Sequence, residues 1–160
     1  MTPYSCNRRS VLGLVSLAAL GLSGCMKQSS GPEEIHYGRE GCAMCGMIIS
    51  DVHFASEIRN ASDKKLVKFD DFGCALNWLK AAKWQDSDVG EFWVMDHEDG
   101  TTWLEARTAS YISGVVTPMN YGYGAVKDAR PGSLTFTKVQ QEVVAKGPSN
   151  YCNPGAEQKA

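Results

Sequence analysis

The chain has 160 residues, of which 43% are hydrophobic and 21% are charged, and its formal net charge at pH 7 is −2. This length predicts one domain, and the composition is that of an ordinary globular protein. The slightly acidic balance argues against a nucleic-acid-binding protein.

The first 24 residues have the pattern of an export signal. Arg8 and Arg9 form a short basic region, and the uncharged segment 11–24 follows them. That segment is too short to span a bilayer, which takes about 20 residues, so residues 1–24 are interpreted as a signal peptide. The paired arginines leave both the general and the twin-arginine export routes open.

The end of this signal, Leu22-Ser23-Gly24-Cys25, resembles a bacterial lipobox. A lipobox predicts that Cys25 is diacylated and becomes the first mature residue; the alternative is cleavage elsewhere, with Cys25 incidental. Removing Arg8 and Arg9 leaves 14 basic against 18 acidic residues, a net charge of −4. Residues 25–40 are predicted to be the lipidated cysteine and a flexible tether, because they begin with small and polar side chains.

The first half of the domain, which is predicted to span residues 41–146, has the pattern ββαβ. Apolar alternation and β-prone runs predict the strands, and apolar residues at helical spacing predict the helix, capped by Asp70 or Asp71. The predicted elements are strands 53–59 and 64–69, a helix from 72 to about 82, and strand 91–96.

The second half predicts the same order less clearly. Its predicted elements are strand 101–105, a partner at 110–113 with 115–116, a short helix at 123–128, strand 133–136 and a helical segment 137–145. Two ββαβ units favour an α+β fold over a doubly wound parallel sheet. Residues 147–160, which contain Cys152, are predicted to be a loose tail.

The segment Cys42-Ala43-Met44-Cys45-Gly46-Met47 concentrates sulfur. Thiolates and thioethers are soft ligands that favour Cu(I), and Cys45 and Met47 would supply two of the ligands it needs. A dithiol redox centre or a structural disulfide between Cys42 and Cys45 are open alternatives, as is simple packing of the methionines. A structural zinc site is disfavoured because the sequence shows no second ligand pair at zinc-binding spacing.

Met119 is the second candidate ligand, because it lies in the glycine-rich loop 117–124, where a thioether is more available than in a core. The alternative is a methionine that fills a gap in the core. Cys74 is predicted to be a buried, inert thiol within the first helix. The three histidines have no metal-binding spacing and are interpreted as surface residues.

Taken together, these motifs resemble the NosL family, copper-chaperone lipoproteins of nitrous oxide reductase maturation. The resemblance covers nearly the whole mature domain and rests on an ordered series of segments. They are the lipobox at Cys25, Cys45-Gly46-Met47 followed by Phe54, Lys68-Phe69-Asp70-Asp71-Phe72-Gly73-Cys74, Trp93-Val94-Met95-Asp96, Trp103-Leu104-Glu105-Ala106 and Thr117-Pro118-Met119.

The resemblance implies the two-unit ββαβ fold shared with the C-terminal region of organomercurial lyase. It implies one Cu(I) bound by Cys45, Met47 and Met119, with Cys42 as an additional ligand or a redox partner. It also implies a periplasmic, lipid-anchored protein, more at the outer than at the inner membrane. The implied partners are nitrous oxide reductase and its ABC-type maturation complex, and no catalysis is expected. The competing function is a thiol-disulfide oxidoreductase that uses Cys42 and Cys45.

Overall fold

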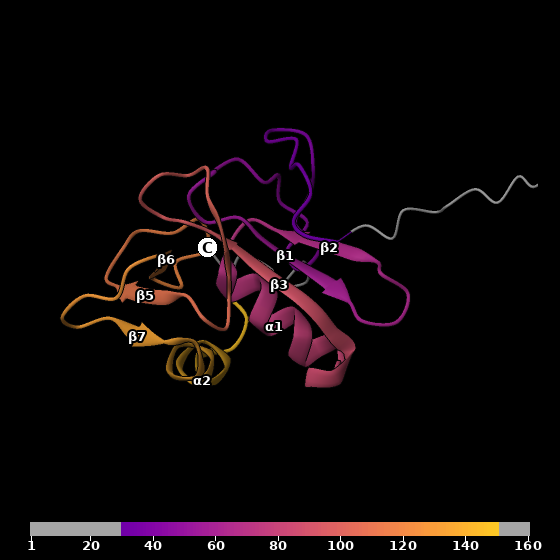
Figure 1. Cartoon of the computed structure of the whole chain (residues 1–160). Coiled ribbons are helices and arrows are strands. Elements are labelled where there is room, and N and C mark those ends of the chain that lie inside the picture. Colours follow the sequence, from indigo (N-terminus) through magenta and orange to yellow (C-terminus); the bar gives the residue numbers. More distant parts are fainter. Residues whose placement is uncertain (1–29, 151–160) are drawn as a thin grey trace, which may run out of the picture.

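A computed structural model describes residues 30–150, in which two antiparallel sheets and two helices form a mixed domain (Figure 1). The predicted signal peptide, Cys25 and Cys152 lie outside the described residues. Within residues 30–150, neither helix is long and apolar enough to cross a membrane.

The first sheet has the strand order β2-β1-β3-β4. Its strands are β1 (Ser56–Asn60), β2 (Leu66–Phe69), β3 (Val89–Met95) and β4 (Trp103–Glu105). The register pairs Ile58 of β1 with Val67 of β2 and with Phe92 of β3. Because side chains alternate along a strand, this register gathers the apolar ones on one face, where a helix covers them.

Helix α1 (Phe72–Ala82) begins directly after β2 and is capped by Asp71. The Gly73 N–H donates to Asp71 Oδ1 at 2.8 Å, which satisfies one free donor of the first turn. The helix ends at Lys83, which adopts a left-handed conformation with φ of 57°. A short 3₁₀ turn, η1 (Asp86–Asp88), leads into β3.

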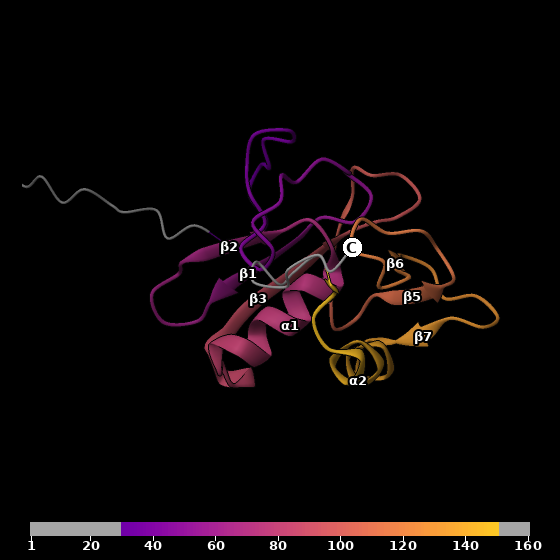
Figure 2. The same ribbon diagram turned by 180° about the vertical axis from the view of Figure 1, so that it is seen from behind.

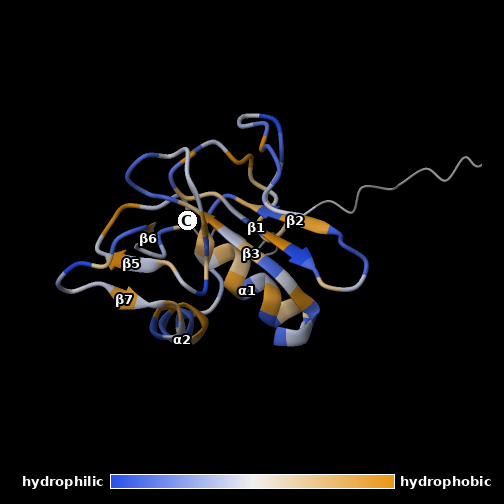
Figure 3. Ribbon diagram, viewed as in Figure 1, coloured by the Kyte–Doolittle hydropathy of each residue, from blue (hydrophilic) through white to orange (hydrophobic). Residues whose placement is uncertain are grey.

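The second sheet has the order β6-β5-β7 and is followed by helix α2, which contacts α1. Its elements are β5 (Ser110–Ser113), β6 (Tyr123–Val126), β7 (Leu134–Thr135) and α2 (Phe136–Lys146). The Phe72 ring stacks on Tyr111 at 4.8 Å between centroids, which joins the two halves in one core. Figure 3 shows hydrophobic residues where helices and strands meet and hydrophilic ones in turns such as that between β1 and β2.

The α+β class is confirmed, and so are the ββαβ order of the first half and the cap at Asp71. The helix predicted over 123–128 is wrong, because residues 123–126 form strand β6. All four residues of β6 are buried and pair with β5, and Gly124 lies against the His97 ring. The second half therefore runs β4-β5-β6-β7-α2, and β4 joins the first sheet.

Both faces of β1 are buried, because residues 31–50 cover the face that α1 does not. We call residues 31–50 the covering segment; it lies beside β1 and β2 in both views (Figures 1 and 2). Ile35 and Ile49 of this segment are buried in the core. Its 31–40 part, which the sequence assigns to the tether, is thus packed on the domain.

Buried charges hold the covering segment in place. Arg59 on β1 is ion-paired with Glu33 at 3.0 Å and with Glu91 at 3.3 Å. The Gly31 N–H donates to Glu91 at 2.9 Å, and Lys68 on β2 is ion-paired with Glu40 at 2.8 Å. Because a buried arginine is costly unless paired, these contacts couple the segment to the sheet.

Candidate metal centre

The cysteine-rich segment forms a tight loop within the covering segment. Gly41 and Ile48 form an isolated antiparallel bridge, and the Cys42 N–H donates to the Met47 carbonyl at 2.8 Å. The Gly46 N–H donates to the Cys42 carbonyl at 2.8 Å, with Gly46 at a φ of 75°, which suits glycine. The loop closes on itself and holds Cys42 and Cys45 near each other.

This loop lies on the end of β2, where Asp70 follows the strand. The Ala43 N–H donates to the Lys68 carbonyl at 3.0 Å, which fixes the loop beside the strand. The Cys45 thiol lies 3.7 and 3.8 Å from the two carboxylate oxygens of Asp70. Two segments 25 residues apart in sequence therefore share one polar pocket.

The first turn of α1 adds a third thiol, that of Cys74. The donor atoms of Cys42, Cys45, Asp70 and Cys74 all lie within 4.8 Å of one another. Four ligands at about 2.3 Å in a tetrahedron would be about 3.8 Å apart, so a small inward movement suffices to bind one ion. Among the described residues, this group has the composition and spacing of a metal site.

The four groups differ in their access to solvent. Cys42 is 3% exposed, Asp70 2% and Cys74 0%, whereas Cys45 is half-buried. The cluster is closed on the side of the core and open beside Cys45. Such a site can hold an ion away from water and still present one ligand to a partner.

The Cys42 and Cys45 thiols ionise at different pH values. A hydrogen bond from Cys74 lowers the pKa of Cys42 to about 5, and a hydrogen bond from Asp70 acts in the same direction. Burial, with the neighbouring Cys42 thiolate acting in the same direction, raises the pKa of Cys45 to about 12. The pair therefore supplies one thiolate at neutral pH, and a bound cation would favour the second.

Asp70 is held in a poorly solvated position. Burial raises its pKa to about 7, and a hydrogen bond with Cys42 adds to the effect. Cysteine thiols are its neighbours in the cluster, so a cation bound there would compensate the carboxylate charge.

Met47 lies at the mouth of the cluster. Its backbone N–H donates to the Cys45 sulfur, which opposes the rise in the Cys45 pKa. Met47 is 46% exposed as a residue, and Ile48 is also exposed. The predicted ligand Met47 therefore contacts the cluster through its backbone N–H, and the residue is exposed to solvent.

Met119 reaches the same region from the second half of the chain. Its backbone N–H donates to Asp71 Oδ2 at 3.1 Å, and the neighbouring Thr117 also bonds Asp71. Met119 is 1% exposed and belongs to the same buried cluster as Cys42 and Cys74. The structure brings Met119 to the first turn of α1, and its role as a ligand stays a prediction.

Sequence reasoning missed Asp70 and Cys74 as members of the cluster. The sequence pattern predicts Asp70 only as a candidate helix cap and Cys74 only as an inert thiol. The signal that could have found them is their position, because Asp70 directly follows strand β2 and Cys74 lies in the first turn of the helix that comes next. A thiol there benefits from the positive end of the helix dipole.

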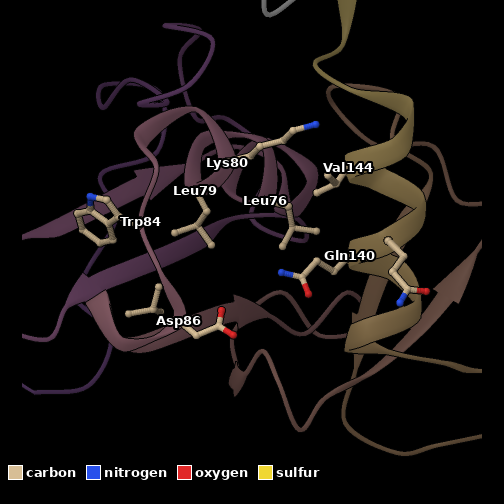
Figure 4. Close-up of a pocket in the computed structure, with 9 residues that line it drawn as sticks. Leu76, Leu79, Lys80, Trp84, Asp86, Gln140 and Val144 are labelled. Atoms are coloured by element: carbon tan, nitrogen blue, oxygen red, sulfur yellow. The ribbon is translucent and has the colours of Figure 1, made fainter.

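A separate groove of about 340 Å³ lies between α1 and α2 (Figure 4). Leu76, Leu79 and Trp84 line one side, and Gln140 and Val144 of α2 line the other. None of the cluster residues lines it, so the groove and the sulfur-rich site are distinct.

Comparisons with known proteins support the fold. No protein-family model matches the chain, and no curated protein sequence matches it. Among solved structures, the chain is similar to the copper chaperone NosL from Shewanella denitrificans, with a TM-score of 0.53 and 16% identity. The match covers 74% of this chain and 89% of that one.

Proposed function

We propose that the chain is a Cu(I)-binding metallochaperone. The observation that carries the proposal is the cluster of three thiols whose sulfur atoms lie within 4.8 Å of one another, open to one side. Three soft donors at this spacing suit Cu(I), which needs only two or three ligands. The fold likeness to a copper chaperone supports the same conclusion.

The proposed ligands divide into strong and weak ones. Cys45, with Cys42 as an additional thiolate, offsets the charge of Cu(I) and binds it tightly. Met47 and Met119 add neutral thioethers, which bind more weakly and exchange more easily. This combination excludes free copper yet lets the ligand of an acceptor protein attack from the exposed Met47 side.

The proposed destination is the copper site of nitrous oxide reductase, reached through an ABC-type maturation complex. Support comes from the ordered motifs around Cys45 and Met119 and from the fold likeness to NosL. The lipobox-like segment before Cys25 supports a periplasmic protein anchored by lipid, at the inner leaflet of the outer membrane more than at the inner membrane.

Titration with Cu(I) tests the proposal. The full chain, reduced and metal-free under anaerobic conditions, is titrated against a chromophoric chelator that competes for Cu(I). We expect one Cu(I) per chain, with Cys45→Ala and Met119→Ala each weakening binding by at least about tenfold. Met44→Leu is the control, because it removes a thioether of the same loop that is not a proposed ligand. Unchanged affinity in both test variants would overturn the assignment.

The competing oxidoreductase function makes a different prediction for Cys42→Ser. A dithiol exchanger would lose its activity, whereas a copper carrier should keep most of its binding through Cys45 and the remaining sulfur ligands. The geometry favours the carrier, because Cys42 is 3% exposed and an attacking thiolate must reach a partner disulfide. A wild-type chain that does not bind Cu(I) but does reduce disulfides would favour the exchanger.

A further inference from the structure

Cys42 and Cys74 form a buried pair of thiols that joins two different parts of the fold. Cys42 lies in the covering segment and is 3% exposed, whereas Cys74 lies in the first turn of α1 and is 0% exposed. A hydrogen bond links the two side chains. Two thiols in contact on rigid elements have the arrangement from which a disulfide forms with little movement of the backbone.

Cys45 differs from this pair in its access to solvent. It is half-buried, and its thiol lies 3.7 and 3.8 Å from the two carboxylate oxygens of Asp70. The sulfur atoms of all three cysteines nevertheless lie within 4.8 Å of one another. Cys45 is therefore the thiol that an external molecule can reach, and it is close enough to exchange a disulfide with the buried pair.

We propose that Cys42 and Cys74 form a reversible disulfide, which is made through Cys45 and fixes the covering segment to α1. The oxidant is a disulfide, either of a partner protein or of a small thiol such as glutathione, of the kind that an oxidising compartment outside the cytoplasm contains. The disulfide stands on the geometry of the three thiols, whereas its effect on copper rests on the proposed function.

Three exchange steps carry the disulfide inward. The Cys45 thiolate attacks the incoming disulfide, which forms a mixed disulfide and releases one thiolate of the oxidant. The Cys42 thiolate then attacks the Cys45 sulfur and releases the second thiolate of the oxidant. Finally, the Cys74 thiolate attacks the Cys42 sulfur, and Cys45 leaves as a thiolate. Cys42 and Cys74 have then lost two electrons and two protons, and the oxidant has become two thiols.

Burial and loop length favour this end point over a disulfide between Cys42 and Cys45. A reducing thiol reaches the buried Cys42–Cys74 pair only after local opening, whereas Cys45 stays accessible. The Cys42–Cys74 disulfide encloses residues 43–73, whereas the alternative encloses only residues 43–44. The longer loop removes more conformational freedom from the unfolded chain, so the folded state gains more from it.

The oxidised chain keeps a smaller set of soft ligands. Cys45 remains as one thiolate, and Met47 and Met119 are unaffected thioethers. Because two of the three thiols are lost, this state holds a soft cation more weakly than the reduced state does. The redox state of the buried pair thereby sets how tightly the site holds copper, and oxidation favours its release.

Disulfide mapping tests the pairing. The full chain, reduced and metal-free, is oxidised anaerobically with glutathione disulfide, its remaining thiols are alkylated, and its peptides are analysed by mass spectrometry without reduction. We expect a disulfide between Cys42 and Cys74, with Cys45 alkylated. The urea midpoint should lie about 1 M above that of the reduced chain. A final disulfide that contains Cys45, or none that joins Cys42 to Cys74, overturns the proposal.

Three variants test the route through Cys45. Cys45→Ser should slow disulfide formation at least about tenfold and leave the end product unchanged. Cys74→Ser should stop the exchange at a Cys42–Cys45 disulfide and abolish the rise in urea midpoint. Cys152→Ser, a change outside the described residues, is the matched control and should alter neither result. A Cys45→Ser chain that is oxidised as fast as the wild type overturns this route.

Metal binding separates this proposal from the copper function. Ag(I), a soft ion that does not reduce disulfides, replaces Cu(I) in competition with a chelator. The oxidised chain should bind Ag(I) at least about tenfold more weakly than the reduced chain. Equal affinity in the two states overturns the control of copper binding. A reduced chain that binds neither Ag(I) nor Cu(I) overturns the copper function and leaves a mapped Cys42–Cys74 disulfide standing.

Discussion

Glu57 on β1 is a buried carboxylate that the fold accommodates at a cost. One of its oxygens accepts the Glu33 N–H at 2.9 Å, and the other accepts no hydrogen bond from the described residues. Burial raises its pKa to about 7, and the nearby Glu33 charge adds to this, whereas Lys68 and Arg59 oppose it. The charged form of Glu57 is therefore disfavoured in the folded state.

This shift predicts a pH dependence of stability. The folded pKa of about 7 lies above the usual glutamate pKa of 4.5, so the contribution of Glu57 is fully present below pH 4.5 and is lost as the pH rises through 7. Glu57→Gln should raise the free energy of unfolding by about 1–3 kcal/mol at pH 8 and change it little at pH 4.5. Urea unfolding at both pH values measures this. An equal effect at both pH values would show that charge is not the cause.

At the residue scale, the sequence pattern indicates which types of side chain form the cluster but not all of its members. The spacing of Cys42 and Cys45 placed two thiols on one loop, and both belong to the cluster. Cys74 lies 29 positions after Cys45, and its approach depends on how the loop lies on β2. The loop is held there by the hydrogen bond from the Ala43 N–H to the Lys68 carbonyl. A hydrogen bond between backbone groups does not depend on the side chains, so the sequence does not reveal it.

At the element scale, the first turn of α1 connects the two halves of the chain. Asp71 caps the helix and also accepts the Met119 N–H, and the Tyr121 ring lies directly against Gly73. The Tyr121 hydroxyl is held in turn by Asn77 and by the Ser149 N–H. A side chain at position 73 would separate the loop that carries Met119 from the turn that carries Cys74.

Gly73→Ala tests this close contact. A Cβ at this position would lie 2.2 Å from ring carbons of Tyr121, so the ring or the helix would have to move. We expect a loss of about 3 kcal/mol of stability, although replacing a helical glycine by alanine normally gains about 1 kcal/mol. Gly41→Ala is the control, because its Cβ would lie 3.8 Å from the nearest atom. Thermal and urea unfolding of both variants measure the difference, and a stabilised Gly73→Ala would contradict the packing.

The elements of the first half were predictable because local signals agreed with one another. Alternating apolar residues, the Asp71 cap and an apolar helical stripe all indicated ββαβ, and α1 spans residues 72–82 as predicted. In residues 123–126, the local sequence signals do not agree on one type of element. Their strand is formed by pairing with β5 and by the fit of Gly124 against His97, both of which are tertiary contacts.

At the scale of the whole molecule, the covering segment decides where the folded domain begins. Ile35 is buried, and the Glu33–Arg59 and Glu40–Lys68 ion pairs fasten residues before Gly41 to the first sheet. The sequence suggested a tether here because small and polar residues dominate positions 26–34. Pairing of these charges with Arg59 and Lys68 depends on the fold and is not visible in composition.

Shortening the chain from its N-terminus tests whether residues 31–40 are a flexible tether or part of the folded domain. A chain that begins at residue 30 should unfold at the same urea concentration as the full chain. A chain that begins at residue 41 should lose about 3 kcal/mol or more, because it exposes the site of Ile35 and leaves the buried Arg59 without Glu33. Equal midpoints for the two truncated chains would place the boundary at residue 41 after all.

The attachment of Gly31 to Glu91 also limits how far the domain can travel. Only five residues separate Cys25 from Gly31, and six residue-to-residue steps reach at most about 20 Å, whereas a domain of this size is about 35 Å across. If Cys25 is anchored as proposed, the domain cannot turn end over end above the bilayer. A flexible 20-residue insertion before Ser30 should therefore slow copper delivery to a membrane-bound acceptor without changing Cu(I) affinity, as transfer kinetics on vesicles would show. With that proposed anchor, so short a connection would confine the search for an acceptor to two dimensions at a nearly fixed height, and would hold the sulfur-lined opening at a restricted angle to the membrane.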